Sequence, residues 1–476
     1  MFKIKKMPDK SNYPPLKEKD LPRPPHWSRA LGVGVVVMGL AIGTGELIMW
    51  PNLTVRFGLS ILWGAFIGIL FQYFINREVA RLSIATGESF FTTSSRILSY
   101  LAPFWLISAF ILYIWPGWAG AIGTSLTALT GLGNHILWAW ASLILVLLLT
   151  LKGRVAYKVL EKGLMITVPL FFILLVTISI QNLAWQDLAK GAAGLFSIGW
   201  LPDDIDIPMF LAAVVFAGAG GLLNLAVSLW YRDKQFGMGS YIGRITNPIT
   251  GKQEAVPATG FTFKPNERNI KNFKGWMRLV DIDQGLIFFC LGLLTLFLLS
   301  LNSYVVLKPK GLVPEGLQVA VVQANIFGEK WGIWGYNLFL FMTSLMLFSV
   351  MWALLDAFTR IVSDIIYVNS KSGPLKKYFS FAKNLSLSSL YYILITTIVF
   401  SGIILLPFNT PLIFLKVSAV LAGAVMALYT PILAYAVNTK LPKEVRPSLI
   451  TNIALVSASV FYLVFSVLIL KARLFP

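Results

Sequence analysis

About eleven apolar runs of roughly 20 residues each constrain this chain more than any other feature of its sequence. A helix of about 20 residues crosses the roughly 30 Å hydrocarbon layer of a membrane. We therefore expect an all-α polytopic membrane protein with about eleven transmembrane helices. The runs lie near residues 29–50, 59–80, 101–130, 134–151, 156–180, 207–230, 281–302, 331–358, 388–407, 411–437 and 449–471.

The composition excludes a water-soluble enzyme. Hydrophobic residues make up 57% of the 476 residues and charged residues only 13%, whereas soluble domains carry about 25% charged residues. There is no phosphate-binding G-x-x-x-x-G-K-[ST] motif and no C-x-x-C pair. We expect no enzymatic activity and no cofactor, and a small ion or solute and the lipid bilayer as the partners.

Lysine and arginine residues are unevenly divided between alternate loops. If the N-terminus is cytoplasmic, 32 of the 40 basic residues fall in cytoplasmic segments, as the positive-inside rule requires. We therefore attribute the net charge of +19 to membrane topology and expect no nucleic-acid partner. The predicted location is the plasma (inner) membrane, with the N-terminus in the cytoplasm and the C-terminus outside.

Two glycine-rich interruptions lie in the first and sixth runs, which correspond if the first ten runs form two halves of five. Paired interruptions of this kind point to the substrate site of a secondary transporter, because unwound backbone there frees carbonyl and N–H groups. The alternative is that small residues let helices pack closely. The interruptions read Gly43-Thr44-Gly45-Glu46 in the first run, and Gly218-Ala219-Gly220-Gly221 followed by Asn224 in the sixth.

Glu46 is the sharpest single candidate, because a carboxylate within a span costs about 3 kcal/mol or more unless it has a partner. It could bind a metal or sodium ion, carry a proton, or pair with Lys416 in the tenth run. Lys416 could instead extend to the membrane surface. Asp356 could belong to a pathway, or form a local i,i+4 ion pair with Arg360.

Several segments resemble the Nramp family of proton-coupled divalent-metal transporters. The resemblance covers runs one to six and implies a leucine-transporter-like fold, with a substrate site at the breaks of runs one and six. It divides the chain into a cytoplasmic tail (1–28), a first five-helix repeat (29–180), an inverted second repeat (207–437, with a cytoplasmic loop at 231–280) and an eleventh helix (449–471). The matching segments are Gly32 to Pro51, Leu62 to Glu88, Tyr157 to Lys162, and Asn224.

The chain departs from that family at its metal ligands. The family motif Asp-Pro-Gly-Asn falls on Gly43 to Glu46, and Met-Pro-His falls on Gly221 to Leu223. Only Glu46 and Asn224 carry over as metal ligands, and both offer oxygen. A hard cation such as magnesium or manganese would suit this set better than iron or zinc.

The sequence therefore leaves three functional hypotheses. The first is a metal-cation transporter working by alternating access, with or without proton coupling. The second is a transporter of an amino acid or another small organic solute on the same fold. The third is a transport-inactive scaffold or sensor that uses the 231–278 loop, in which a hairpin is predicted between Tyr241 and Phe263. For the two transporters, the predicted site contains Gly43, Thr44, Gly45, Glu46, Gly220, Gly221 and Asn224, with Asp356 and Lys416 as pathway candidates.

Overall fold

The computed structural model describes residues 13–27, 31–114, 116–408 and 411–474. Within these ranges, the side chains of residues 44, 317, 411–417, 419 and 472–474 are not described. The predictions that rest on the side chains of Thr44 and Lys416 therefore lie outside the described residues.

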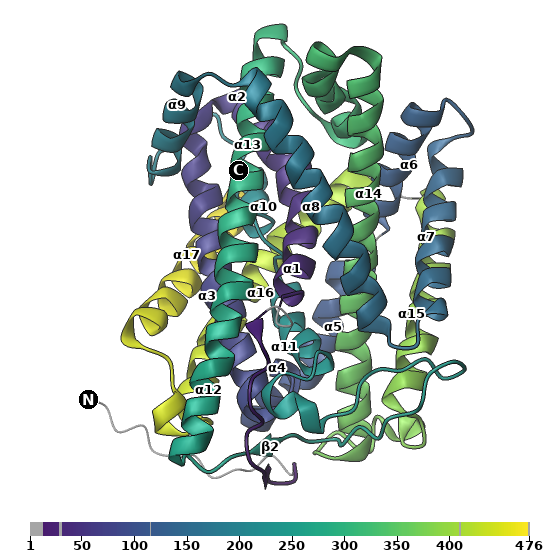
Figure 1. Ribbon diagram of the computed structural model, residues 1–476, viewed down its shortest axis with the longest axis vertical. Helices are drawn as coiled ribbons and strands as arrows, with labels where there is room; N and C mark the ends of the chain where they lie inside the picture. Colours follow the sequence, from purple (N-terminus) through teal and green to yellow (C-terminus); the bar gives the residue numbers. More distant parts are fainter. Residues whose placement is uncertain (1–12, 28–30, 115, 409–410, 475–476) are drawn as a thin grey trace.

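All eleven predicted runs coincide with helices of an integral membrane protein (Figure 1). Within the described ranges, ten helices are long and apolar enough to cross a membrane. The remaining predicted span, the sixth at 207–230, consists of two shorter helices. We number these spans one to eleven in chain order.

The first six spans comprise the following elements: α1 (Val33–Ala41), the π-helix η2 (Ile42–Met49) and α2 (Trp50–Phe57) in span one; η3 (Leu59–Leu62) and α3 (Trp63–Thr86) in span two; α5 (Leu101–Tyr113) and α6 (Gly117–Thr130) in span three; α7 (His135–Lys152) in span four; α8 (Ala156–Asn182) in span five; α10 (Ile207–Val215) and α11 (Leu223–Asp233) in span six. Short helices α4 (Phe90–Ile97) and α9 (Trp185–Leu195) connect neighbouring spans.

Spans seven and eight are much longer than the apolar runs that predict them. The remaining spans comprise α12 (Glu267–Val280), the π-helix η5 (Asp281–Leu291), α13 (Gly292–Asn302) and η6 (Ser303–Leu307) in span seven; α14 (Val319–Lys371) in span eight; α15 (Leu387–Leu405) in span nine; α16 (Pro411–Thr439) in span ten; and α17 (Leu449–Leu474) in span eleven. Gly332, with φ +59°, separates a first segment of α14 from the spanning one. The division into two inverted repeats stays a prediction.

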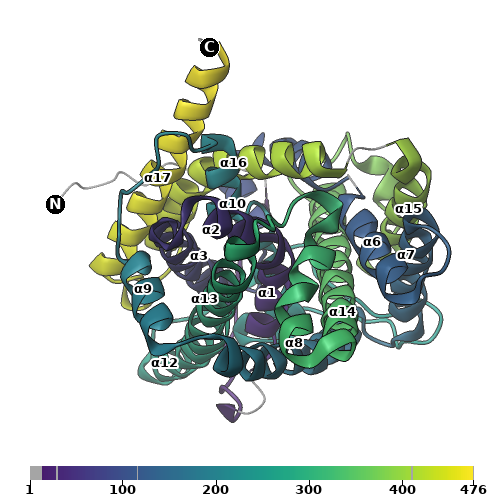
Figure 2. The ribbon, with the colours of Figure 1, turned by 90° about the horizontal axis from the view of Figure 1, so that it is seen from above.

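Span one lies at the centre of the bundle. Seen from above, α1 and α2 are surrounded by α3, α13, α8, α14 and α16 (Figure 2). All of the most apolar 18-residue stretch of span one is buried in protein, against 28% for α7 and α17 at the periphery. A helix that is apolar on every side is stable in such a position.

Six segments are predicted to be cytoplasmic: the N-terminal tail and the loops that follow spans two, four, six, eight and ten. They meet at one end of the bundle, which we call the basic face. Hydrogen bonds join the N-terminal segment to α4, the loop after α7 to the loop after α11, and α3 to the loop after α16. These bonds are Arg96 to the Pro14 carbonyl, Asn247 to the Arg154 carbonyl, and Arg81 to the Val445 carbonyl. Tyr367, near the end of α14, similarly donates to the Val256 carbonyl. The alternation inferred from the basic residues is therefore present in the fold.

The N-terminal segment 13–27 crosses the basic face as a strap. Its strand β1 (Lys17–Glu18) pairs in parallel with β2 (Phe261–Thr262), and the Leu21 and Pro22 carbonyls accept bonds from Asn272 and Trp276 of α12. One expectation was wrong here. No hairpin forms within the described residues 241–263, because Phe261–Thr262 pairs with the strap instead. The predicted cytoplasmic loop 231–280 contains helix α12 from Glu267 onward.

We expect Tyr13→Phe to loosen this strap. Burial raises the pKa of Tyr13 to about 12, so at neutral pH its hydroxyl keeps the proton that it donates to Asn369 Oδ1 at 2.6 Å. Loss of this buried bond should cost about 1 kcal/mol. Limited proteolysis should then cut segment 13–27 several times faster than in the wild type. Tyr241→Phe removes a bond from a more exposed hydroxyl to the Asp20 carbonyl of the same strap, so it should have a smaller effect. Equal cleavage of all three proteins would contradict the expectation.

Candidate functional site

Span six is broken at the glycines predicted from the sequence. Helix α10 ends at Val215 and α11 begins at Leu223, and Gly220 and Gly221 between them have φ of +73° and +55°. Only glycine adopts these angles without strain. The carbonyl groups of residues 216–219 are buried and accept no hydrogen bond from any residue that the structure describes. Buried carbonyls without partners are uncommon, and such groups can coordinate a cation.

Span one is not unwound, contrary to the expectation from its two glycines. Residues 42–49 continue the helix as the π-helix η2. The glycines instead allow close packing: a Cβ on Gly45 would lie 1.9 Å from the Phe216 carbonyl oxygen, and one on Gly43 would lie 2.2 Å from Val350 Cγ2. The packing interpretation thus holds for span one, and it places η2 directly against the break in span six.

Gly45→Ala should separate η2 from that break. A methyl group at 1.9 Å from a backbone oxygen cannot be accommodated without moving one of the two spans. We expect a loss of stability of about 1–3 kcal/mol, read as a lower melting temperature of the purified protein. Gly402→Ala, whose Cβ would make an ordinary 3.4 Å contact in span nine, should melt like the wild type. If Gly45→Ala also does so, the close approach is absent.

Glu46 lies in η2 and is fully buried. Neither of its carboxylate oxygens has a hydrogen-bond partner in the described part of the chain. The hydroxyl of Thr295 on α13 lies beside this carboxylate but donates to the Gly292 carbonyl at 2.8 Å. An ionised carboxylate in such a place requires a cation, and a neutral one carries a proton.

Asn224 retains free oxygen capacity in the first turn of α11. Its amide nitrogen donates to the Tyr429 hydroxyl of α16 at 3.2 Å, and its Oδ1 has no partner among the described residues. No hydrogen bond links Glu46 to Asn224 in the ranges described. The two predicted ligands therefore face different neighbours, span seven for Glu46 and span ten for Asn224.

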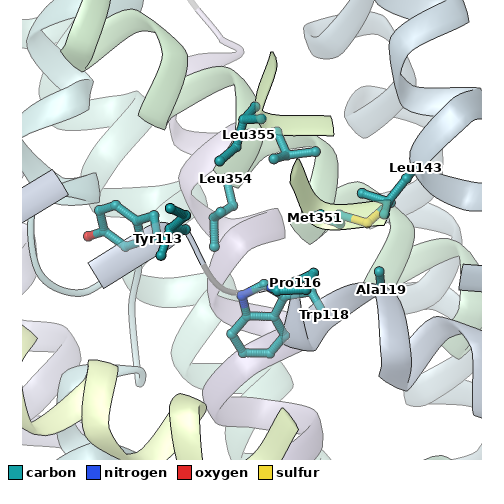
Figure 3. A pocket seen from close by; sticks show the side chains of 11 residues that line it. Tyr113, Pro116, Trp118, Ala119, Leu143, Met351, Leu354 and Leu355 are labelled. Carbon is teal, nitrogen blue, oxygen red and sulfur yellow. The ribbon is translucent and has the colours of Figure 1, made fainter. Parts of the chain in front are cut away.

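Span three is interrupted at Pro116, as its Pro-Gly pair predicts. A small apolar pocket lies at this interruption. Figure 3 shows Trp118 of α6 and Met351 and Leu354 of α14 around this pocket, with the Tyr113 hydroxyl turned away from Met351. That hydroxyl points toward span six, since a Cβ on Gly221 would lie 2.8 Å from it. The Tyr113 hydroxyl has no hydrogen-bond partner among the described residues.

Asp356 is not an isolated carboxylate, because it belongs to a buried ion cluster between α11 and α14. Arg360 bonds to Asp356 at 2.6 Å within α14 and reaches across to Asp233 at the end of α11. Trp230 and Tyr391 also donate to the Asp356 carboxylate, at 2.8 and 2.6 Å. The local i,i+4 pair is therefore present, but it is one part of a connection between two spans.

Two further bonds fasten the same end of α11. Arg232 pairs with Asp364 of α14 at 2.5 Å, and Tyr231 donates to Asp283 of η5 at 2.8 Å. Asp283 in turn accepts the backbone N–H groups of Gly32 and Gly34 at the start of span one. Four consecutive residues of α11, 230–233, thus tie the inner half of span six to spans one, seven and eight. We call these bonds the latch.

The sequence-based predictions missed Gln72 of α3, Thr295, and the latch residues Asp233, Asp283, Asp364 and Arg232. Gln72 and Thr295 are polar residues in the middle of apolar runs, which was a usable signal. The latch bonds between α11 and α14 join residues more than 120 positions apart, and no pattern in one sequence reveals such pairing. Among the described residues, no group of three or more His, Cys, Asp or Glu could hold a metal ion, so backbone and amide oxygens would have to supplement Glu46.

Solved structures share this architecture. A histidine-to-alanine variant of the manganese transporter from Eremococcus coleocola superposes with a TM-score of 0.70 at 12% identity, covering 96% of this chain and 90% of the other. The same transporter in complex with an aromatic bis-isothiourea substituted compound gives a TM-score of 0.67 at 12% identity with the same coverage. No protein-family profile and no curated protein matches the chain. The fold that the resemblance to the Nramp family implies is thereby confirmed: this chain has the fold of a polytopic membrane transporter.

Proposed function

We propose that the protein is a secondary-active transporter that moves a metal cation by alternating access. The observation that carries the proposal is Glu46, a fully buried carboxylate with two unpartnered oxygens, in the helix that packs against the break of span six. A cation beside Glu46 would offset the cost of holding its charge within the membrane. The fold shared with a manganese transporter supports this function.

The donor atoms around the break favour a hard divalent cation such as Mn²⁺ or Mg²⁺. Among the described residues, the oxygen atoms without partners here include the Glu46 carboxylate, Asn224 Oδ1, the Tyr113 hydroxyl and the carbonyls of residues 216–219. No cysteine, histidine or methionine occupies positions 43–46 or 216–224, so the site lacks the ligands that soft metals prefer. Oxygen donors suit magnesium, calcium and manganese.

Alternating access assigns a role to the latch. Its residues are buried and bonded, so the basic face is closed beneath the break. The positive-inside rule makes this face the cytoplasmic one, with the N-terminus inside and the C-terminus outside. Release of the cation into the cytoplasm would require the bonds from α11 to α14 to break, while the Asp356–Arg360 pair would move as one unit with α14.

A small organic solute such as an amino acid is the second candidate. The Tyr113 hydroxyl lies next to the first backbone amides of α11, at Leu222 and Leu223. A helix N-terminus attracts carboxylates, and the apolar pocket beside Tyr113 could receive part of a side chain. In this case Glu46 would bind the amine or a coupled proton.

Thermal-shift measurements on the purified protein separate the candidates. We expect stabilisation by Mn²⁺ or Mg²⁺ at concentrations above their dissociation constants, by about 2.7 kcal/mol at 100-fold excess over the dissociation constant, and none by amino acids. Uptake of Mn²⁺ into proteoliposomes should follow. Stabilisation by an amino acid alone would favour the second candidate, and the absence of any shift or uptake would favour the inactive scaffold.

A further inference from the structure

Gln72 is a fully buried amide in the middle of span two. It lies on α3 in an apolar environment, where an unpaired amide would be costly. Its side chain contacts span six and no part of the ion cluster described above. The proposed function does not account for it.

The amide of Gln72 bridges the two sides of the break. Its Nε2 donates to the Val215 carbonyl at 2.9 Å and to the Val214 carbonyl at 3.4 Å, at the end of α10. Its Oε1 accepts the N–H of Gly220 at 2.9 Å. One side chain thus closes the loop 216–219 at both of its ends.

This arrangement determines which backbone groups remain free. The last carbonyls of a helix have no partner within the helix, and here Gln72 satisfies those of Val214 and Val215. The carbonyls of the enclosed residues 216–219 are the ones left without partners. Gly218 also depends on Gln72, since a Cβ there would lie 2.5 Å from Gln72 Oε1.

We infer that Gln72 is a positioning residue: it holds the break of span six in the shape that presents the 216–219 carbonyl oxygens to the transported cation. The cation as ligand rests on the proposed function, whereas the bridge across the break rests on the geometry alone. We assign Gln72 no contact with the cation: its oxygen accepts the Gly220 N–H, and its nitrogen donates to α10.

Hydrogen–deuterium exchange tests the bridge without any ligand. In Gln72→Met, which keeps the length but removes all three bonds, exchange at Gly220 should be at least tenfold faster than in the wild type. Gln72→Asn, one methylene shorter, should behave similarly, and Gln72→Glu should retain protection because it keeps the acceptor. Asn302→Leu is the matched control, because Asn302 is a buried amide that bonds Ser179 and the Leu298 carbonyl away from the break.

The second arm measures the Mn²⁺ concentration that gives half of the maximal thermal shift. We expect it to rise about tenfold in Gln72→Met and Gln72→Asn and to stay unchanged in Asn302→Leu. Faster exchange without a change in this midpoint would overturn the positioning role. An exchange rate at Gly220 equal to that of the wild type in both Gln72→Met and Gln72→Asn would overturn the bridge itself. If the wild type shows no Mn²⁺ shift, the proposed function fails, while the exchange arm still decides whether Gln72 bridges the break.

Discussion

Replacing Glu46 with glutamine should strongly weaken Mn²⁺ binding and transport while leaving the protein at least as stable as the wild type. Glutamine has nearly the same shape but no charge, so the replacement removes a buried carboxylate that has no partner among the described residues. A carboxylate in mid-span costs about 3 kcal/mol or more, and the apo protein should therefore not lose stability. Loss of the one charged ligand should weaken Mn²⁺ binding by about 2–3 kcal/mol, or roughly 30–150-fold.

Proteoliposome uptake and the Mn²⁺-dependent melting temperature are the two measurements for this variant. Glu329→Gln is the control, because Glu329 is an exposed carboxylate paired with Lys310 outside the site. A combination of gained stability and lost binding is typical of a residue kept for function. Wild-type Mn²⁺ affinity in Glu46→Gln would exclude Glu46 as the ligand, and a large drop in apo stability would show that its role is structural.

Arg360→Met should be the most destabilising change in the latch. Removing one partner of a buried ion pair costs about 3–5 kcal/mol, because the remaining charge is left uncompensated. Here two carboxylates, Asp356 and Asp233, would be left buried, at 1% and 3% exposure. We expect a clear fall in the melting temperature of the purified protein.

A triple variant separates this charge effect from a loss of packing. Combining Arg360→Met with Asp233→Asn and Asp356→Asn removes all three charges, and the asparagines can still accept bonds. This variant should recover much of the lost stability, since neutral replacements of buried ion clusters are often tolerated. Lys310→Met, which breaks the exposed pair with Glu329, should cost less than about 1 kcal/mol. A melting temperature of Arg360→Met equal to that of Lys310→Met would contradict the latch.

The helical framework was predictable because each span carries its own signal. An apolar run of about 20 residues is helical in a membrane whatever surrounds it, since its backbone groups must be satisfied internally. The Pro116 interruption and the Gly220–Gly221 break followed from single residues whose backbone preferences are strong. The meeting of the basic segments at one face likewise followed from alternation along the chain.

Features that depend on which spans are neighbours could not be predicted from one sequence. Gly43 and Gly45 could either unwind a helix or permit close packing, and only contact with Val350 and Phe216 decides between these. The strap was missed for the same reason, because Phe261–Thr262 could pair with a nearby strand or with residues 17–18. No hydrogen bond joins the predicted ligands Glu46 and Asn224 among the described residues, and their placement likewise depends on how the helices are rotated.

The π-helix η2 also sets the rotation of everything that follows it in span one. A π-helix has i→i+5 hydrogen bonds, so it holds more residues per turn than an α-helix. Deleting one residue from 42–49 would rotate α2 about the helix axis relative to α1, because residues of a π-helix and of an α-helix turn by different angles. Asn52 would then lose the Pro314 carbonyl, to which it donates at 2.8 Å. The outer end of span one is thus positioned by the number of residues around Glu46, so insertions and deletions there should displace it.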